Sequence, residues 1–239
     1  MPSLLPARAA GGRPGRGSRA ALAIGLGASL AVFALYLLGA LTPLEDVVTD
    51  QLMRWRGRQP ADPRIAICAV DARSIDRYGR WPWRRTRVAE LIDGLAAAGA
   101  RVIALDIVFS EPSYPELAAD DAALAASIAR AGNVVLGYFF RRDAGRANAP
   151  ELAGTGIDIV RAPPGGFPAV PSFRAVEANL APFAAAADAQ GFFSHEREGG
   201  VLRHYRLLAR HRGGFYPALA LRAVERFQRR EPHSAGTPP

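Results

Sequence analysis

RIAICAVDARSIDRYGRWPWRRTRVAELIDGLAAAGARVIALDIVFSEP, residues 64–112, is the stretch that decides the fold of this chain. It contains two short apolar runs, and each of them ends at a carboxylate. The first run, Ile65–Val70, leads into Asp71, and the second, Val102–Leu105, leads into Asp106. Continuous apolar runs of this length are typical of strands that are buried on both faces of a parallel sheet. The sequence therefore predicts a strand at each run.

The residues between the two runs have the spacing of an amphipathic helix. Apolar side chains fall at positions i, i+3, i+4 and i+7 within residues 88–95, and Gly99 follows where a left-handed glycine commonly ends a helix. Two parallel strands joined by such a helix form a right-handed crossover, and ligands of these sheets bind beyond the carboxyl ends of the strands. We therefore expect Asp71 and Asp106 at one edge of the sheet, and we look for a site there.

The chain after residue 112 continues the alternation of helices and strands. A helix is expected over Leu117–Ala131, stopped by Gly132, and a third apolar strand over Val134–Phe140. This βαβαβ order predicts an α/β fold with a mostly parallel sheet in a three-layer arrangement. After a long loop at 141–170, we expect a helix at 179–189 capped by Asn179, strands at 191–194 and 201–209 with a turn at 198–200, and a helix at 216–229 with Val224 facing inward and Arg222 outward.

An uncharged apolar segment, Ala20–Leu41, follows an arginine-rich tail. As a helix, this segment would span about 33 Å, which is enough to cross a hydrocarbon core of about 30 Å. The apolar region of a cleaved signal peptide is shorter, but Leu38-Gly39-Ala40 resembles a cleavage site, so cleavage stays open. We predict a transmembrane helix.

The charges around this segment indicate its orientation. Four arginines precede it, which favours a cytoplasmic N-terminus and a body outside the cytoplasm: Arg8, Arg13, Arg16 and Arg19. The expected location is the inner (cytoplasmic) membrane, crossed once. The predicted division is a disordered cytoplasmic tail at 1–19, a transmembrane helix at 20–41, an extracytoplasmic domain at 43–232 and a disordered tail at 233–239.

Residues 43–57, PLEDVVTDQLMRWRG, are expected to form a helix directly after the span. Val47, Val48, Leu52 and Trp55 could form one apolar face of this helix. A linker helix packed on the domain and a helix that transmits motion across the membrane both fit the pattern, and the sequence does not separate the two.

The composition argues against several classes of protein. The formal net charge is +8, and all 30 basic residues are arginine, but they are scattered and form no basic stripe interleaved with aromatic residues. We therefore expect no nucleic-acid partner. The single cysteine, Cys68, excludes an intramolecular disulfide and a CxxC metal site. No nucleophile elbow or phosphate-binding glycine loop is present, and no cofactor is predicted.

Carboxylates at the strand ends are the first candidates for chemistry. Asp71 and Asp106 could hold a divalent cation, and Glu111, Asp120 or Asp121 could join them. The competing interpretation, which we favour, is that the two strand-end aspartates cap turns and accept from backbone N–H groups. The spacing is not a metal signature, so no metal is predicted.

The motif Trp81-Pro82-Trp83 is more distinctive. Two tryptophans beside a proline can wall a ligand pocket, and they can equally plug the top of the core. Arg84 and Arg85 follow at a helix start, where positive charge is unfavourable with the helix dipole. An anionic ligand would relieve that cost, and pairing with one of the strand-end aspartates would do the same. The residues predicted to line a ligand site are Asp71, Trp81, Trp83, Arg84, Asp106 and Glu111.

The chain resembles the second class of CHASE domains, which are extracellular sensory modules of bacterial cyclases, histidine kinases and diguanylate cyclases. The resemblance covers about residues 45–230. The residues that carry it are Asp50, RWRG at 54–57, ICAVD at 67–71, Ser74-Ile75, GRWPWR at 79–84, AGA at 98–100, DIVF at 106–109 with Glu111-Pro112, Asp121, Leu124-Ala125 and GNVVL at 132–136.

The resemblance implies one N-terminal span, an extracytoplasmic sensor, and further spans leading to a cytoplasmic output domain. Residues 198–203, EGGVLR, match only loosely the Asp-Gly-x-x-Arg-like turn that the family has late in the domain. The output domain is expected to lie outside this sequence. We therefore predict a membrane-anchored extracytoplasmic sensory domain of a bacterial signal-transduction protein, without enzymatic activity of its own.

The expected partners are the membrane and a small-molecule or protein ligand of unknown identity, and a homodimer is left open. Two other functions remain as alternatives. One is a metal-assisted hydrolase that uses Asp71 and Asp106. The other is a purely structural or dimerising domain.

Overall fold

The computed structural model describes residues 16–141, 152, 170–194 and 202–229, with side chains from residue 20 onward. The chain divides into two compact units, Met1–Ala69 and Val70–Pro239. Residues 1–15 of the tail predicted at 1–19, the tail predicted at 233–239, the turn at 198–200 and nearly all of the predicted long loop lie outside the described residues. Residues 16–19, predicted to be disordered, belong to the first helix instead.

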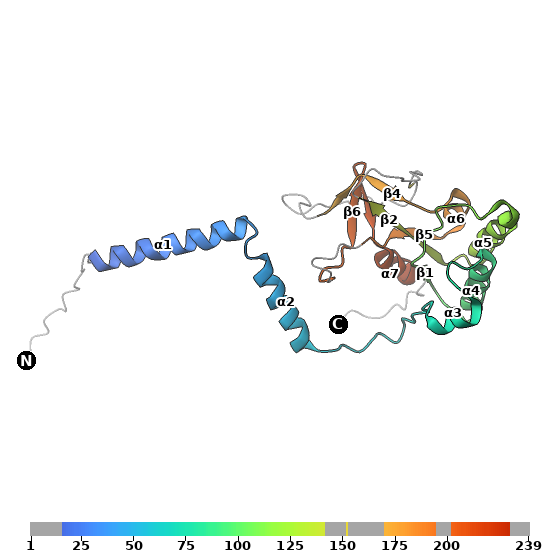
Figure 1. Cartoon of the computed structure of the whole chain (residues 1–239), viewed down its shortest axis with the longest axis horizontal. Coiled ribbons are helices and arrows are strands. Elements are labelled where there is room, and N and C mark those ends of the chain that lie inside the picture. The colour runs from blue at the N-terminus through green and yellow to red at the C-terminus, as the bar shows by residue number, and fades with distance from the viewer. Residues whose placement is uncertain (1–15, 142–151, 153–169, 195–201, 230–239) are drawn as a thin grey trace, which may run out of the picture. The chain divides into compact units, whose positions relative to one another are not determined.

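The first unit contains two helices, α1 (Arg16–Leu37) and α2 (Thr42–Arg56), joined by a turn (Figure 1). Within α1, the 18 residues Ala20–Leu37 are long and apolar enough to cross a membrane, and none of them is buried. A signal sequence has the same properties, so this helix supports a membrane anchor only in part. α1 ends before the predicted Leu41 because Gly39 has a positive φ of 70° and a new helix, with Pro43 in its first turn, begins at Thr42.

The strand predicted at Ile65–Val70 is wrong. Residues 57–71 contain no helix or strand, and Ile65 and Ile67 are 69% and 88% exposed. Apolar composition makes a strand only where a neighbouring strand completes its hydrogen bonds, and no described strand pairs with this segment.

The second unit is built around β2 (Val134–Arg141). β1 (Ile103–Leu105) and β5 (Ala189–Phe192) both pair with β2 in parallel, whereas β4 (Ala175–Glu177) pairs with its last residues in antiparallel orientation. β1 and β2, joined through a helix, confirm one of the two predicted crossovers. The sheet is mixed, so the expectation of a mostly parallel sheet holds only in part.

A smaller sheet has the order β3 (Ser172–Phe173), β6 (Leu208–His211) and β7 (Gly214–Pro217). β3 and β6 are parallel, and β6 and β7 form an antiparallel hairpin. The strand predicted at 201–209 thus occupies later residues, and the residues predicted to start the last helix belong to β7 instead.

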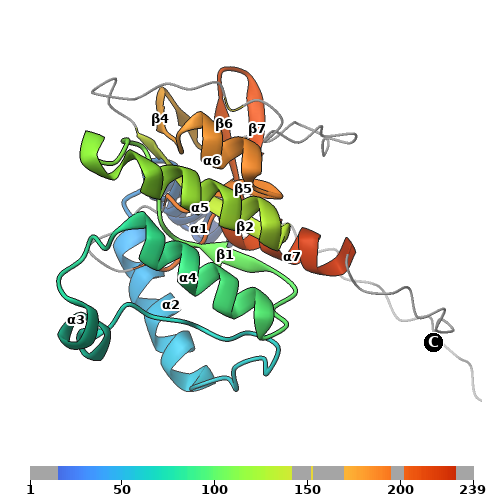
Figure 2. The same ribbon diagram turned by 90° about the vertical axis from the view of Figure 1, so that its right-hand side faces the viewer.

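The helices of this unit are α3 (Ala72–Tyr78), α4 (Arg85–Ala97), the 3-10 helix η1 (Pro115–Leu117), α5 (Ala118–Ala131), α6 (Ala181–Ala186) and α7 (Leu219–Arg229). α4 and α5 lie side by side (Figure 2). Gly99 and Gly132 have φ of 85° and 63°, as expected of glycines that end α4 and α5.

Two apolar clusters lie along β2. The first half of β2 packs with β1 and with the inner faces of α4, α5 and α6, and its buried residues include Ile92, Leu124, Ile128 and Phe183. The second half packs with β3, β4, β5 and β6, where Phe140 stacks on Phe173 with ring centroids 5.3 Å apart. β1 ends at Leu105, which pairs with Leu136 of the first cluster, and the candidate site begins in the loop that follows.

The faces predicted for the last helix are reversed in part. Arg222 is only 6% exposed and donates to Glu225 at 2.6 Å, whereas Val224 is 51% exposed. A buried arginine is tolerated because its charge is paired and its aliphatic stem packs as an apolar group.

Candidate functional site

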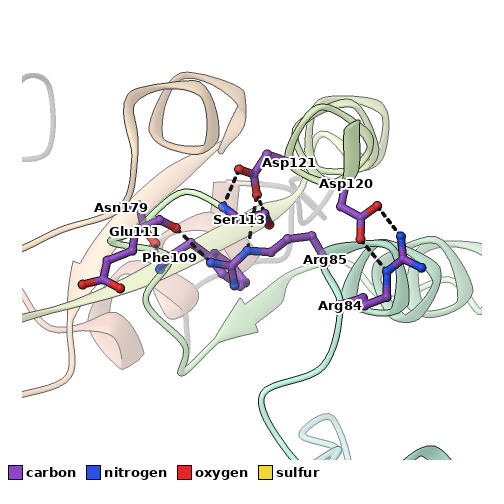
Figure 3. Close-up of polar contacts among 8 residues, drawn as sticks. All are labelled: Arg84, Arg85, Phe109, Glu111, Ser113, Asp120, Asp121 and Asn179. Carbon is purple, nitrogen blue, oxygen red and sulfur yellow. Dashed lines mark hydrogen bonds and ion pairs between the residues drawn. The ribbon is translucent and has the colours of Figure 1, made fainter. Parts of the chain in front are cut away.

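The N-termini of α4 and α5 are joined by an arginine–aspartate pair (Figure 3). Arg84, the residue that precedes α4, donates from Nε and Nη2 to the two carboxylate oxygens of Asp120, each at 2.9 Å. This is the planar, two-bond geometry in which a guanidinium recognises a carboxylate best. Asp120 is buried, while the Arg84 side chain remains 62% exposed.

Asp120 interacts with the N-termini of both α4 and α5. It lies in the first turn of α5, where a negative charge is favourable with the helix dipole. It also accepts hydrogen bonds from Thr86, in the first turn of α4. The bonds from Arg84 and Thr86 and the positive charge of Arg84 lower the pKa of Asp120, in opposition to its burial. This carboxylate therefore supplies the negative charge that the arginine-rich start of α4 lacks.

The next arginine makes a second, more buried set of contacts. The guanidinium of Arg85 lies over the ring of Phe109 at 4.4 Å from its centroid, and its Nε is 3.5 Å from Oδ1 of Asp121. Its Nη2 donates to the backbone carbonyl of Glu111 at 3.2 Å. Burial lowers the pKa of Arg85, and Asp121 acts against that change. Arg85 thus fastens the loop after β1 to the start of α4.

Asp121 holds the other side of the same loop. Its carboxylate accepts from the backbone N–H of Ser113 at 2.9 Å and from the Ser113 hydroxyl at 2.8 Å. The segment 109–113 is therefore bound to two helix starts through side chains, which fixes the backbone from which the exposed Glu111 side chain extends.

A buried asparagine fixes the beginning of this loop. Asn179 accepts from the backbone N–H of Phe109 at 2.8 Å and donates to the carbonyl of Gly137 at 2.9 Å and to Gln190 at 3.2 Å. It does not cap α6 as predicted, because the residue preceding that helix is Leu180. One side chain thus joins the loop after β1 to β2 and β5.

The two tryptophans of the predicted rim belong to an aromatic cluster before α4. Trp83 lies edge-on to Tyr78 and Trp81, with ring centroids 5.6 and 5.7 Å apart. Its indole N–H donates to the carbonyl of Gly79 at 2.8 Å. Trp81 is 40% exposed. The cluster therefore supports the α3–α4 turn through Trp83 and presents the ring of Trp81 to solvent.

The strand-end aspartates have separate environments. Asp71 accepts from the backbone N–H and the hydroxyl of Ser74, which makes it the cap of α3 and lowers its pKa. This agrees with the capping interpretation. Asp106 is exposed, and its charge acts on Tyr205, whose pKa is raised by burial first and by Asp106 in addition. Among the described residues, no group of three or more His, Cys, Asp or Glu side chains converges as a metal site would require.

Four of the six predicted rim residues thus lie around the start of α4. Trp81, Trp83 and Arg84 precede this helix, and Glu111 is joined to it through Arg85. The expected partners of the arginines were wrong, since the carboxylates come from α5 rather than from the strand ends. The adjacent acidic pair in the first turn of α5, Asp120-Asp121, is the sequence signal that could have identified them.

The fold and these contacts define an α/β domain that is preceded in the sequence by an apolar helix. The model of the CHASE2 domain family matches residues 27–237, which is most of the chain. The chain therefore belongs to the CHASE2 domain family, an extracellular sensory domain family. Neither the curated proteins nor the solved structures compared with the chain gave a match.

Proposed function

We propose that this chain is a membrane-anchored extracytoplasmic sensory domain of a bacterial signal-transduction protein. The observation that carries the proposal is the match of the CHASE2 family to residues 27–237. In this proposal α1 anchors the chain in the inner membrane, and residues 43–232 form the sensory body outside the cytoplasm. The body has no catalytic role, and it biases a signalling output of the cyclase or kinase kind.

The proposed anchor is supported by the composition of α1, and its orientation is supported by the charges that precede this helix. Residues 20–37 of α1 are uncharged, apolar and exposed along their whole length, as a helix surrounded by lipid would be. The sequence before Ala20 carries four arginines, and arginines of this kind are retained on the cytoplasmic side.

The body is proposed to have three layers. Ile103, Leu105, Val134 and Leu136 all belong to the cluster formed with α4, α5 and α6, so one face of the sheet is turned toward these helices. α7 packs against β1, β2 and β5 without contributing a residue to that cluster. A helix on the opposite face of the sheet accounts for both observations.

The ligand is proposed to bind at the start of α4, on a rim formed by Trp81, Arg84 and Glu111. Each of these side chains has an exposed part, while the groups beneath them are held by short hydrogen bonds and ion pairs. Trp83 supports the rim from below. Asp106 stays at its edge, and Asp71 leaves the proposed site because it caps α3.

The location is tested with fusions after Arg229. Alkaline phosphatase, which is active only outside the cytoplasm, should be active, and a fluorescent protein that matures only in the cytoplasm should stay dark. The reverse pair of signals would contradict the proposal, and activity in the culture medium would indicate cleavage of the helix.

Ligand binding is tested by thermal shift of the full chain in detergent against amino acids, dicarboxylates, sugars and divalent cations. A compound that binds only the native state raises the melting temperature. Such a shift should vanish in Trp81→Ala and persist in the control Val224→Ala, which changes an exposed apolar side chain of α7. A shift that both variants retain would remove the rim from the proposal.

A further inference from the structure

α2 carries a continuous apolar stripe that is exposed within the first unit. No residue of this 15-residue helix is buried. The stripe consists of Leu44, Val47, Val48, Leu52 and Trp55, which are 49% to 75% exposed. At about 100° per residue, these side chains fall within an arc of roughly 140°. A stripe of this width is the face that a helix normally buries against another element.

The spacing of the stripe is that of a helix that pairs with a second helix. Leu44, Val48, Gln51 and Trp55 follow one another at intervals of four, three and four residues, the heptad spacing of a coiled-coil seam. Val47 and Leu52 flank the seam and widen its apolar surface. Gln51 is the one polar member, and a polar side chain at a single seam position specifies the register of the pair at some cost in stability.

The charges on the remaining face argue against the bilayer surface as the occupant. Helices that lie on membranes carry Lys and Arg on the polar face and are drawn to anionic lipid. In α2 the part nearest α1 carries Glu45, Asp46 and Asp50, and Arg54 and Arg56 come only at the far end. Anionic headgroups would repel the acidic part.

We propose that α2 of one chain pairs in parallel with α2 of a second copy through this stripe. The inference rests on the proposed function in one respect, the anchoring by α1. Two copies anchored in the same orientation present α2 in parallel, and anchoring raises their effective concentration. The higher effective concentration is needed because a helix of four turns is too short to form a stable coiled coil when free in water. α2 is then the element through which two sensory bodies are held at a fixed distance.

The test uses single cysteines in the full chain, reconstituted in phosphatidylcholine vesicles with and without phosphatidylglycerol. Native Cys68 is exposed and is first changed to Ser. Val48→Cys places a thiol in the seam, and Met53→Cys is the matched control, similarly exposed (49% and 47%) but on the opposite face. Under mild oxidation Val48→Cys should form disulfide-linked dimers about tenfold faster or more, because only seam positions face each other.

Equal rates at the two positions, or no dimer at either, would overturn the pairing. A third variant, Leu52→Cys labelled with a fluorophore, detects the competing occupant: stronger quenching by brominated lipid than at position 53, without dimers, would assign the stripe to the bilayer. Carbonate extraction of the same vesicles reports on the anchor separately. A chain that stays in the membrane without selective dimers refutes the pairing alone, and a chain that is released but dimerises selectively refutes the anchor alone.

Discussion

Arg84 and Asp120 are separated by 36 residues and form two hydrogen bonds of 2.9 Å that join the starts of α4 and α5. The pair places an acidic side chain at the N-termini of α4 and α5, which are the positive ends of the two helix dipoles. α4 also has two arginines in its own first turn. The stability of the site is therefore coupled to the ionisation of one carboxylate.

The first prediction concerns Asp120→Asn. The folded-state pKa of Asp120 lies below its ordinary value of 3.8, so its charged form stabilises the fold above that pH, and the contribution is lost as the pH falls through the folded-state pKa. The native chain should therefore melt at a higher temperature than the variant at pH 7, and the difference should shrink below about pH 4. Thermal unfolding followed by circular dichroism at several pH values measures this. A difference that is constant with pH would show that Asp120 acts through packing alone.

The second prediction concerns Asn179→Ala. This change leaves the buried N–H of Phe109 and the carbonyl of Gly137 without their side-chain partner. An unsatisfied buried polar group costs about 1–3 kcal/mol, so the free energy of unfolding should fall by about that amount or more. Urea denaturation gives the value, and Ser172→Ala, at an exposed position, should change it by less than about 0.5 kcal/mol. An Asn179→Ala variant as stable as that control would contradict the role assigned to the asparagine.

The third prediction compares two glycines. A Cβ at Gly191 would lie 2.6 Å from the Cα of Leu219, at the start of α7, whereas a Cβ at Gly94, inside α4, would meet nothing within 4 Å. Gly191→Ala should therefore destabilise the fold by about 1–3 kcal/mol through overpacking. Gly94→Ala should stabilise it by up to about 1 kcal/mol through higher helix propensity. Opposite shifts of the urea midpoint are expected, and equal signs would contradict the close approach of α7 to β5.

The fourth prediction tests the exposed segment before α3. Ile67 is 88% exposed, so Ile67→Ser should leave the free energy of unfolding within about 0.5 kcal/mol of the native value. The matched change in the core, Ile92→Ser, removes a fully buried side chain and should cost more than about 2 kcal/mol. A large loss of stability in Ile67→Ser would mean that residues 65–70 pack as a strand after all.

Local sequence determined the elements in which the pattern of apolar side chains and the signals at the two ends predict the same structure. α4, α5, β1 and β2 lie close to their predicted positions because apolar periodicity, terminal glycines and, in α5, an acidic first turn each specify a local conformation. The cap at Asp71 was predictable for the same reason, since its partner is only three residues away. The family itself was also recognisable from these local motifs.

Tertiary structure decided what depends on distant partners. Ile65–Val70 has the composition of a strand, but hydrogen bonds to another strand are needed to make it one, and no local signal reports whether they exist. Arg84 pairs with Asp120 rather than with the aspartates nearer in the sequence because α4 and α5 pack side by side, and Arg222 is buried because α7 packs against β1, β2 and β5. Composition and periodicity depend on neighbours along the chain, whereas charge pairing and sheet edges depend on neighbours in space, which only the folded chain brings together.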